Sequence, residues 1–569
     1  MTGTTIGRVA SWVSSLRFED IPPRVIEKAK AQLMSVLAAV YAGSLLEESR
    51  SVSDASGRWG QGKEASVLAT GQKRSIEAAV CANTAMSMAL DYDDYLFMGH
   101  SGHSAVLVPL AVCEAEDLRF REMLLAQVAA NEVAGRLGAS ALLGPLNGQM
   151  FSFIHLLASS CSAARLHGLD PSRMGHAMAV ALSHPCFPLE PGFFAAGSKY
   201  LTAALPCLIG LRAVGLARAG LTGPLGVLDH PRGFYRVFSY YPVRGVWGGL
   251  GRQWVTDTVS IKIHPGCAYI SAALDAMAEI FDRVRLSRGR PPEPNEVASV
   301  TVRTSLVGIE MEEHSRAYRD GERLHPVAIG FSLRYSLALM LLAGRLDPES
   351  LTESYLAGHA GELRSLAAKV SVIPDHELNR LLVRAMIEQG GFGAVLAGLS
   401  PRELLYLSVQ AARNYHFGSW FGRAAAAPAD RASRGVRVPG RVPALVAGAL
   451  SALRYALAAY RRAKGRPYDL EEQDLERFSF PFAARVSLEL ADGSRFEAGQ
   501  MIPRGAAGSE ECTREALAEE KFAREARRVL TPVQIEKAIS FIKTAADSAT
   551  VRTLIPLVAR KRAASGSRS

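Results

Sequence analysis

Over residues 1–255, apolar side chains recur every three to four positions, the spacing of helices that bury one face. Residues 23–42 show it clearly, with Ile26, Leu33 and Val40 on one stripe after a proline pair suited to a helix start. The same spacing predicts further helices over 74–95, 107–117, 120–137, 152–167, 172–183 and 199–219. This part of the chain therefore predicts a helical domain.

The pattern changes near residue 256, where apolar and polar residues begin to alternate. Val259, Ile261 and Ile263 share one face of residues 256–264, which predicts a half-buried strand. Further strands are predicted over 297–304, 369–373, 485–490 and 495–498, and an Asp-Gly turn at 492–493 predicts that the last two form a hairpin. Helices are predicted over 270–281, 331–343 and 513–560, so an α+β domain follows the helical one.

These patterns divide the chain into four parts. We predict a helical domain from residues 1–255 and 510–560, and an α+β domain from 256–375 and 479–509. Residues 376–478 form a helical insertion rich in alanine and arginine, with an exposed loop predicted at 424–443 and an apolar run at 444–463 that needs burial. Residues 561–569 form a basic tail that we expect to be disordered. The fold class predicted is mainly α.

Composition narrows the class of protein. The chain has 569 residues, 48% hydrophobic and 21% charged, which is typical of a folded globular protein. Its net charge of +10 fits either a solvated basic surface or a positive field that attracts anionic substrates. No recognised nucleic-acid motif accompanies the charge, so we expect no nucleic-acid partner. The longest apolar runs carry Arg212 and Arg454 at their centres, and neither predicts a membrane span.

The seven cysteines stand singly, without a CxxC pair. Several lie in apolar runs, where a reduced thiol behaves as a small hydrophobic group. This favours a reducing cytoplasm and disfavours a disulfide framework, a zinc knuckle or a cysteine-ligated cluster. The N-terminus predicts no signal peptide, because charged residues come early and no apolar segment precedes them.

A cluster of acidic residues and histidines is the first candidate for chemistry. Asp91, Asp93 and Asp94 stand at the end of the helix predicted over 74–95, where carboxylates oppose the helix dipole. A loop with two glycines follows and presents His100 and His103. Histidine changes its charge near neutral pH, as general acid–base catalysis requires. We expect a functional site here without a metal, because no metal-ligand signature such as HExxH is present.

Two lysines and a tyrosine pair complete the candidates. Lys199 follows Ser198, a suitable N-cap, so the lysine and the backbone N–H groups of the helix start would form an anion site. Lys262 lies on the polar face of the strand predicted at 256–264; taken alone it is also consistent with a solvated lysine. Tyr241 could line a cleft or belong to the core. The P-loop and GxGxxG motifs are absent from the sequence, so we expect no nucleotide cofactor.

Together these segments resemble the MmgE/PrpD family, which includes 2-methylcitrate dehydratase, cis-aconitate decarboxylase and an iminodisuccinate epimerase. The similarity runs from residue 5 to about 375, resumes near 479 and misses the insertion. The matching motifs are FEDIP at 18–22, DYDD at 91–94, EVAGRLG at 132–138, GSK at 197–199, GLTGP at 220–224, IKIHPGC at 261–267 and FSLRY at 331–335.

The resemblance implies a helical domain built from both chain ends, a smaller α+β lid domain and a homodimer with its active site between the domains. By motif position, Asp91 and one histidine of the loop match the family's acid–base residues, and Lys199 and Lys262 match its cleft lysines. His100 fits the spacing of the family's histidine better than His103 does, and we keep both as candidates. No cofactor or metal is implied.

Two positions depart from the family pattern. Gln149 and Ser271 stand where many members have a histidine, and we expect both, with Asp94 and Tyr241, to contact the substrate. These departures disfavour both 2-methylcitrate and cis-aconitate as the substrate, and favour a related acid. We therefore predict a cofactor-independent cytoplasmic lyase that moves a proton next to a carboxylate of a small di- or tricarboxylic acid. The alternatives are a decarboxylase or epimerase on the same scaffold, or a catalytically idle binding or assembly protein.

Overall fold

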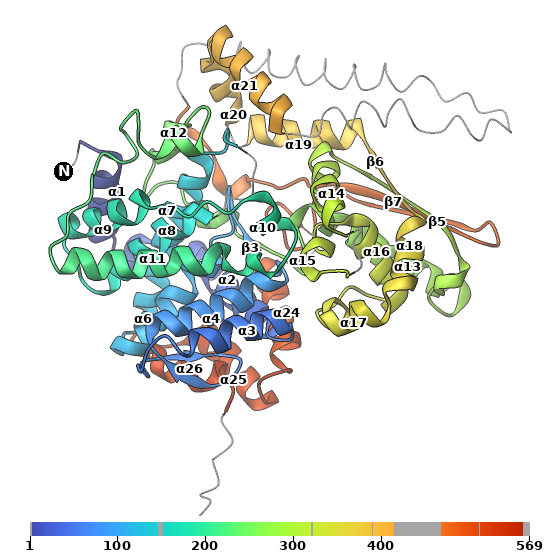
Figure 1. The fold of residues 1–569 in the computed structure, drawn as a ribbon, viewed down its shortest axis with the longest axis horizontal. Helices are drawn as coiled ribbons and strands as arrows, with labels where there is room; N and C mark the ends of the chain where they lie inside the picture. The colour runs from blue at the N-terminus through green and yellow to red at the C-terminus, as the bar shows by residue number, and fades with distance from the viewer. Residues whose placement is uncertain are drawn as a thin grey trace, which may run out of the picture.

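The computed structural model describes residues 3–145, 152–319, 323–389, 391–414, 468–510 and 513–561. Helices dominate these residues, and strands form small sheets (Figure 1). The helices before residue 250 are α1 Thr5–Ser15, α2 Pro23–Gly43, α3 Glu47–Ser56, α4 Ile76–Ala89, α5 Gly102–Ala105, α6 Leu107–Glu116, α7 Phe120–Ser140, α8 Ser152–Leu166, α9 Pro171–Ser183, α10 Glu190–Phe194, α11 Leu201–Arg218 and α12 Phe234–Phe238.

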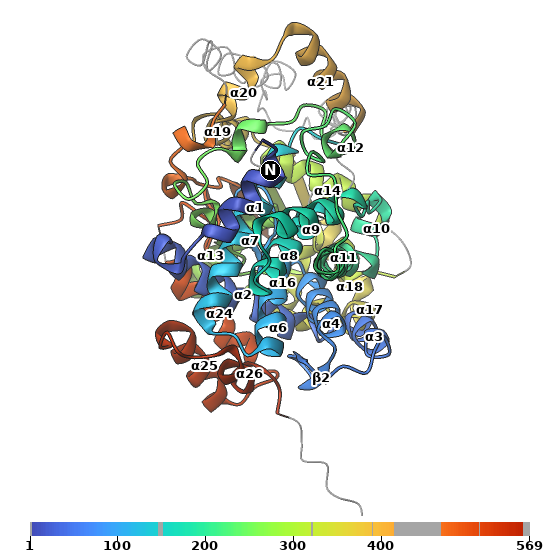
Figure 2. The same cartoon turned by 90° about the vertical axis from the view of Figure 1, so that its left-hand side faces the viewer.

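The later helices include three at the C-terminal end that return to the N-terminal ones. They are α13 Ser271–Arg288, α14 Leu306–Arg319, α15 Pro326–Ile329, α16 Leu333–Ala343, α17 Glu353–Gly358, α18 Ala360–Ala368, α19 His376–Glu388, α20 Phe392–Gly398, α21 Pro401–Asn414, α24 Arg514–Ala526, α25 Pro532–Thr544 and α26 Val551–Val558. Helix α24 packs along α2, and Figures 1 and 2 both show them close together. The two ends of the chain thus share one helical body.

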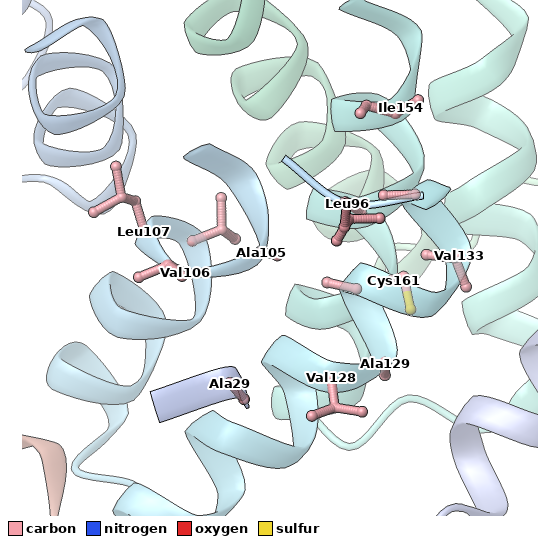
Figure 3. Packing of buried hydrophobic residues seen from close by; sticks show 14 of the residues in the cluster. Ala29, Leu96, Ala105, Val106, Leu107, Val128, Ala129, Val133, Ile154 and Cys161 are labelled. Atoms are coloured by element: carbon pink, nitrogen blue, oxygen red, sulfur yellow. The ribbon is translucent and has the colours of Figure 1, made fainter. Parts of the chain in front are cut away.

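A core of small and branched side chains fills this body. Val128 and Val133 of α7 pack in one buried cluster with Ile154 and Cys161 of α8 and Val106 of the α5–α6 segment (Figure 3). All five are completely buried. The apolar face that the helical spacing predicts is therefore the face that forms the core.

A second cluster of buried residues lies around the larger sheet. The strands β5 Val297–Thr304, β6 Val370–Pro374, β7 Ala484–Leu490 and β8 Arg495–Gln500 pair in the order β6-β5-β7-β8. Strand β6 runs parallel to β5, whereas the other pairs are antiparallel. Helix α13 packs against β7 and β8, and the β7–β8 turn contains Gly493 at φ 88°, as the predicted Asp-Gly hairpin requires.

The predicted strand at 256–264 is wrong over most of its length. Residues Val255–Thr258 form a 3-10 turn, and only Ser260–Ile261 form a strand, β4, which pairs with β3 Asp94–Tyr95. Buried Glu132 explains the difference, because its carboxylate accepts hydrogen bonds of 2.9 Å from the backbone N–H groups of Val255 and Thr256. A short hairpin that we did not predict, β1 Ala65–Val67 with β2 Gln72–Arg74, lies elsewhere.

The Glu132–Arg136 pair, at i and i+4 on α7, is structural. The charged groups lie 3.5 Å apart and both side chains are completely buried. Arg136 donates to the carbonyl oxygens of Val246 and Gln253, at 3.1 and 2.7 Å. Glu132 and Arg136 thus hold the segment that leads into β4 and Lys262.

Several predictions fall on residues outside the described part of the chain. In the insertion, these residues are the predicted exposed loop at 424–443 and the apolar run at 444–463. Nearly all of the basic tail, 561–569, also lies outside it. The described part of the insertion contains α19, α20 and α21. Helix α21 exposes Leu404, Leu405 and Tyr406, which are 47–67% accessible.

Within the described residues, one helical stretch, Gly197–Arg218, is long and apolar enough to cross a membrane. Most of this stretch is buried inside the fold. Core helices of globular proteins can be as long and as apolar, so this stretch is weak evidence for a span.

Helix α25 begins with a capping box that we expect to contribute measurably to stability. The Thr531 hydroxyl accepts from the N–H of Gln534, whose side chain accepts from the N–H of Thr531. Thr531→Ala should lower the free energy of unfolding by about 1 kcal/mol. Denaturant unfolding measures the change, and Thr544→Ala at the other end of the helix is the matched control, expected to change it by less than about 0.5 kcal/mol. Equal losses in the two variants would contradict the capping role.

Candidate active site

Helix α4 ends at Ala89, and the chain then turns through the aspartate loop, which we define as residues 91–95. Asp91 adopts a left-handed conformation at φ 50°, which is uncommon for a residue other than glycine. The turn separates the three carboxylates, which the sequence places almost side by side. Asp91 and Asp93 reach the same lysine, whereas Asp94 points elsewhere.

Lys262 lies next to this loop because β4 pairs with β3. The register places Asp94 opposite Ile261, so Lys262 follows directly beside Asp93. Its ammonium lies 3.0 Å from Asp91 Oδ1, 3.3 Å from Asp93 Oδ1 and 2.8 Å from the Asp91 carbonyl oxygen. The side chain is completely buried, so the reading of Lys262 as a solvated strand lysine is wrong.

Lys199 approaches Asp91 from another part of the chain. It lies on the 3-10 turn Gly197–Tyr200 that precedes α11, and its ammonium is 3.4 Å from Asp91 Oδ1. The rings of Phe193 and Phe331 lie 5.5 and 5.3 Å from it, within reach of a cation–π interaction. We predicted that Ser198 would cap the helix, and this prediction is wrong. The Ser198 hydroxyl instead donates to the Gly192 carbonyl oxygen.

Both histidines of the loop lie at Asp93. His103 is completely buried, with Nε2 2.9 Å from Asp93 Oδ2 and Nδ1 2.7 Å from the Ser87 hydroxyl. His100 is 18% exposed; its Nδ1 lies 2.9 Å from the Asp94 carbonyl oxygen and 3.5 Å from Asp93 Oδ2. An Nδ1–H that donates to this carbonyl leaves Nε2 of His100 as the acceptor nitrogen.

The charges of this cluster stabilise one another. Burial alone would raise the pKa of Asp91 and of Asp93, but the nearby lysines and histidines outweigh it and hold both below their usual range. Burial likewise would lower the pKa of Lys262, but Asp91 and Asp93 raise it above its usual value. The cluster therefore keeps its aspartates ionised and Lys262 protonated.

Asp94 is in a different environment. Its Oδ2 accepts a 2.7 Å hydrogen bond from Gln32, and a Cβ at position 102 would lie only 1.9 Å from its Oδ1, so only glycine fits there. Burial and the neighbouring Asp93 charge raise the pKa of Asp94 to about 7. Asp94 thus faces the helical core, away from the two lysines.

This raised pKa predicts how Asp94 affects stability. Between the pKa of an unfolded aspartate, about 4, and that of folded Asp94, about 7, only the folded state holds the proton. Stability attributable to Asp94 therefore falls as pH rises through this window, and Asp94→Asn should remove the loss. The melting temperature of the variant relative to the wild type should increase between pH 4 and pH 8, whereas Asp547→Asn, an exposed control, should show a constant difference. A constant difference for Asp94→Asn would contradict the assignment.

A cation could compete for part of this cluster. Asp91, Asp93 and His100 each offer a ligand atom, and these atoms lie within 4.8 Å of one another. The Lys262 ammonium, however, already lies within 3.3 Å of both carboxylates. A divalent ion would have to displace this buried cation or accept its repulsion, so the donor set does not fit a metal well.

The remaining predicted residues are not brought to this cluster by any contact in the described part of the chain. Gln149 lies outside the described residues. Ser271 is buried at the start of α13, four residues after Cys267; burial, and next the charge of Asp91, raises the thiol pKa of Cys267 to about 12. Tyr241 lines a separate hollow beside Ala394 and Tyr468.

Two residues at the cluster were missed by sequence reasoning. His155 of α8 is completely buried, its Nδ1 lies 2.8 Å from the Ser104 hydroxyl, and its ring centroid is 5.8 Å from that of His103. The Lys521 ammonium of α24 donates to the Asp93 carbonyl oxygen of the aspartate loop. Both lie in regular helices, where the spacing of apolar residues gives no sign that a polar residue faces inward.

The structure defines a class of protein by two features. The fold is mainly helical, and two buried lysines and two histidines meet at an aspartate loop. Residues 7–244 match the MmgE/PrpD N-terminal domain family, and residues 264–389 match the MmgE/PrpD C-terminal domain family. The chain belongs to the MmgE/PrpD family.

Several curated relatives carry the same printed name. A cis-aconitate decarboxylase of Aspergillus terreus is 26% identical over 307 residues, which cover 50% of this chain and 60% of that protein. A second, from Aspergillus terreus strain NIH 2624, is 26% identical over 59% of this chain and 71% of the relative. The cis-aconitate decarboxylase of Homo sapiens is 24% identical over 64% of this chain and 75% of the relative. The chain thus spans less than two thirds of the first of these relatives.

Proposed function

We propose that the chain is a cofactor-independent lyase that acts on a small di- or tricarboxylic acid. The observation that carries the proposal is the convergence of two buried ammonium groups, Lys199 and Lys262, on Asp91 beside the loop histidines. Buried cations bind carboxylates strongly because little water competes with them. The net charge of +10 adds a field that attracts an anionic substrate.

The chemistry requires stabilisation of negative charge on a carbon next to a carboxylate. When the C–C bond to the leaving carboxylate breaks, CO₂ is released and the electron pair of that bond stays on the carbon that carried the carboxylate. A remaining carboxylate next to this carbon delocalises the negative charge. Lys199 and Lys262 stabilise this charge. His100 takes a proton from solvent at Nε2 and donates it to this carbon, which forms the new C–H bond. Asp91 holds the two ammonium groups in place, and Asp93 orients the histidines.

The sequence made dehydration the first hypothesis, with decarboxylation as an alternative. The printed names of the relatives favour decarboxylation, whereas Gln149 and Ser271 favour an acid other than 2-methylcitrate or cis-aconitate. We therefore place decarboxylation first. Elimination and epimerisation pass through the same kind of carbanion and stay open.

The test is proton NMR in D₂O. The purified chain is incubated with cis-aconitate, citrate and 2-methylcitrate in separate samples, beside a Lys199→Met control. Decarboxylation should release CO₂ and place one deuterium on the carbon that lost the carboxylate. Loss of water would identify a dehydratase, and exchange without loss an epimerase-type reaction. Absence of all three with every acid, combined with no binding of any of them, would support the idle binding protein instead.

We also propose the domain division and assembly that the sequence predicts. The separate buried clusters of the helical body and around β5 and β7 support a helical domain and a lid domain, with residues 376–478 as an insertion. A homodimer is supported by exposed Leu205 and Leu216 on α11, and a cytoplasmic location by the six described cysteines, all of which are free. Light scattering after size-exclusion chromatography tests the dimer.

A further inference from the structure

A cavity of about 160 Å³ borders the aspartate loop at Tyr92. One wall is the face of α24 that carries Lys521, Arg524 and Arg528, and the other walls come from residues 345–348, from Ile263 and His264, and from Arg504. Tyr92 of the aspartate loop also lines it. Neither Asp91 nor the two lysines of the candidate active site is among its lining residues, so this cavity is distinct from that site.

Cations outnumber carboxylates in this lining. The five cationic side chains are Arg345, Arg504, Lys521, Arg524 and Arg528, and the three carboxylates are Asp347, Glu520 and Glu525. Ion pairs neutralise part of this charge, because Arg345 pairs with Asp347, Arg524 with Glu525, and Arg528 with Glu525 and with Glu349 outside the lining. Arg345 is 72% exposed, so breaking its surface pair to turn toward the cavity costs little.

Lys521 is the most telling of these cations. It is 1% exposed, and its ammonium donates to the Ser35 hydroxyl at 2.9 Å and to the backbone carbonyl oxygens of Tyr92 and Asp93. Within the described part of the chain, no carboxylate pairs with this ammonium. Burial lowers its pKa to about 7. These three oxygens take all three N–H donors of the ammonium, so Lys521 contributes its positive charge to the cavity wall, and an anion placed there stabilises that charge.

We propose that this cavity is a second ligand site, specific for a small oxyanion that carries two or more negative charges. Arg345, Arg504 and Arg524 supply the charge-assisted hydrogen bonds, and Lys521 adds positive charge from the cavity wall. Inorganic phosphate and a small polycarboxylate share the required chemistry. The site does not depend on the proposed lyase activity, since its residues are separate from the lysines assigned to that reaction.

The site is built into the support of the aspartate loop. Lys521 holds the loop through two of its carbonyl oxygens, and its ammonium lies 4.0 Å from the centre of the Tyr92 ring. Arg524 donates to the Tyr92 hydroxyl. An anion that draws Lys521 and Arg524 into the cavity would therefore act on the residues that flank Asp91 and Asp93.

Isothermal titration calorimetry on the full chain tests the proposal, with inorganic phosphate and citrate as separate probes. The double variant Arg345→Gln/Arg504→Gln removes two cations and leaves the contacts of Lys521 and Arg524 with the loop intact. Saturable binding of at least one probe to the wild type is expected, and the double variant should raise its dissociation constant roughly tenfold or more. Phosphate alone would identify a phosphate site, and citrate alone a polycarboxylate site.

Two controls separate this site from the candidate active site. Arg477→Gln/Arg495→Gln makes the same change in charge at exposed positions outside the cavity lining, and should bind as the wild type does. Lys199→Met should also retain the binding, because Lys199 does not line the cavity. The proposal is overturned by binding that disappears in Lys199→Met and survives in Arg345→Gln/Arg504→Gln, by equal weakening in both double variants, or by no saturable binding of either probe.

Discussion

Replacing Lys199 with methionine should lower kcat/KM by about 10²–10³, with little change in the free energy of unfolding. The ammonium is one of two cations placed to stabilise the charge that develops on the substrate, and methionine cannot replace this role. The side chain is buried beside the Met88 sulfur and the rings of Phe193 and Phe331. Methionine fits this apolar surrounding, so the fold should tolerate the exchange.

The measurement is steady-state turnover of the acid identified by NMR, together with denaturant unfolding of the same preparations. Lys543→Met is the matched control, because this lysine is 52% exposed on α25 and pairs with Glu519. It should leave both turnover and stability near the wild-type values. Full turnover in Lys199→Met would remove Lys199 from the mechanism.

Much of the fold is predictable from the spacing of apolar residues. Strand β5 begins and ends where the alternation predicts, and α7 begins at the predicted residue. Strand β5 alternates between buried and more exposed positions, so local pattern and final structure agree there, whereas α7 is buried on all sides from Met123 onward. The predicted strand at 256–264 failed because the Glu132 carboxylate, far away in sequence, captures the backbone N–H groups of Val255 and Thr256.

The candidate site was only partly predictable for a related reason. The sequence shows Asp91, His100 and His103 close together and makes Lys199 and Lys262 candidates, and the resemblance adds that the two lysines belong to the same site. It does not show that Lys262 is buried, because the burial follows from the pairing of β4 with β3. Nor does it distinguish Asp93, which contacts Lys262, from Asp94, which contacts Gln32.

The second cavity could not be predicted from sequence. Lys521 and Arg524 occur on a helix whose polar residues suit an exposed surface, and α24 approaches the aspartate loop only because the C-terminal helices pack on α2. Long-range packing of this kind leaves no local pattern in the chain. The same holds for His155, which a helical spacing places in the core.

The two loop histidines should respond differently to substitution, although both lie at Asp93. His100→Gln should lower kcat by about 10²–10⁴, because the proposed proton donor is lost. The free energy of unfolding should change little, since His100 is 18% exposed. His103→Gln should instead destabilise the protein by about 1–3 kcal/mol, because it breaks buried contacts with both Ser87 and Asp93.

Imidazole added to the buffer separates the roles further. In His100→Ala, the partly exposed position can admit imidazole, which should restore part of the turnover by supplying the missing acid–base group. In His103→Ala, the position is completely buried, so added imidazole should have no effect on turnover. Rescue of His103→Ala with none for His100→Ala would reverse the assignment and make His103 the group that moves the proton. Loss of stability without loss of turnover in both alanine variants would remove the histidines from the chemistry.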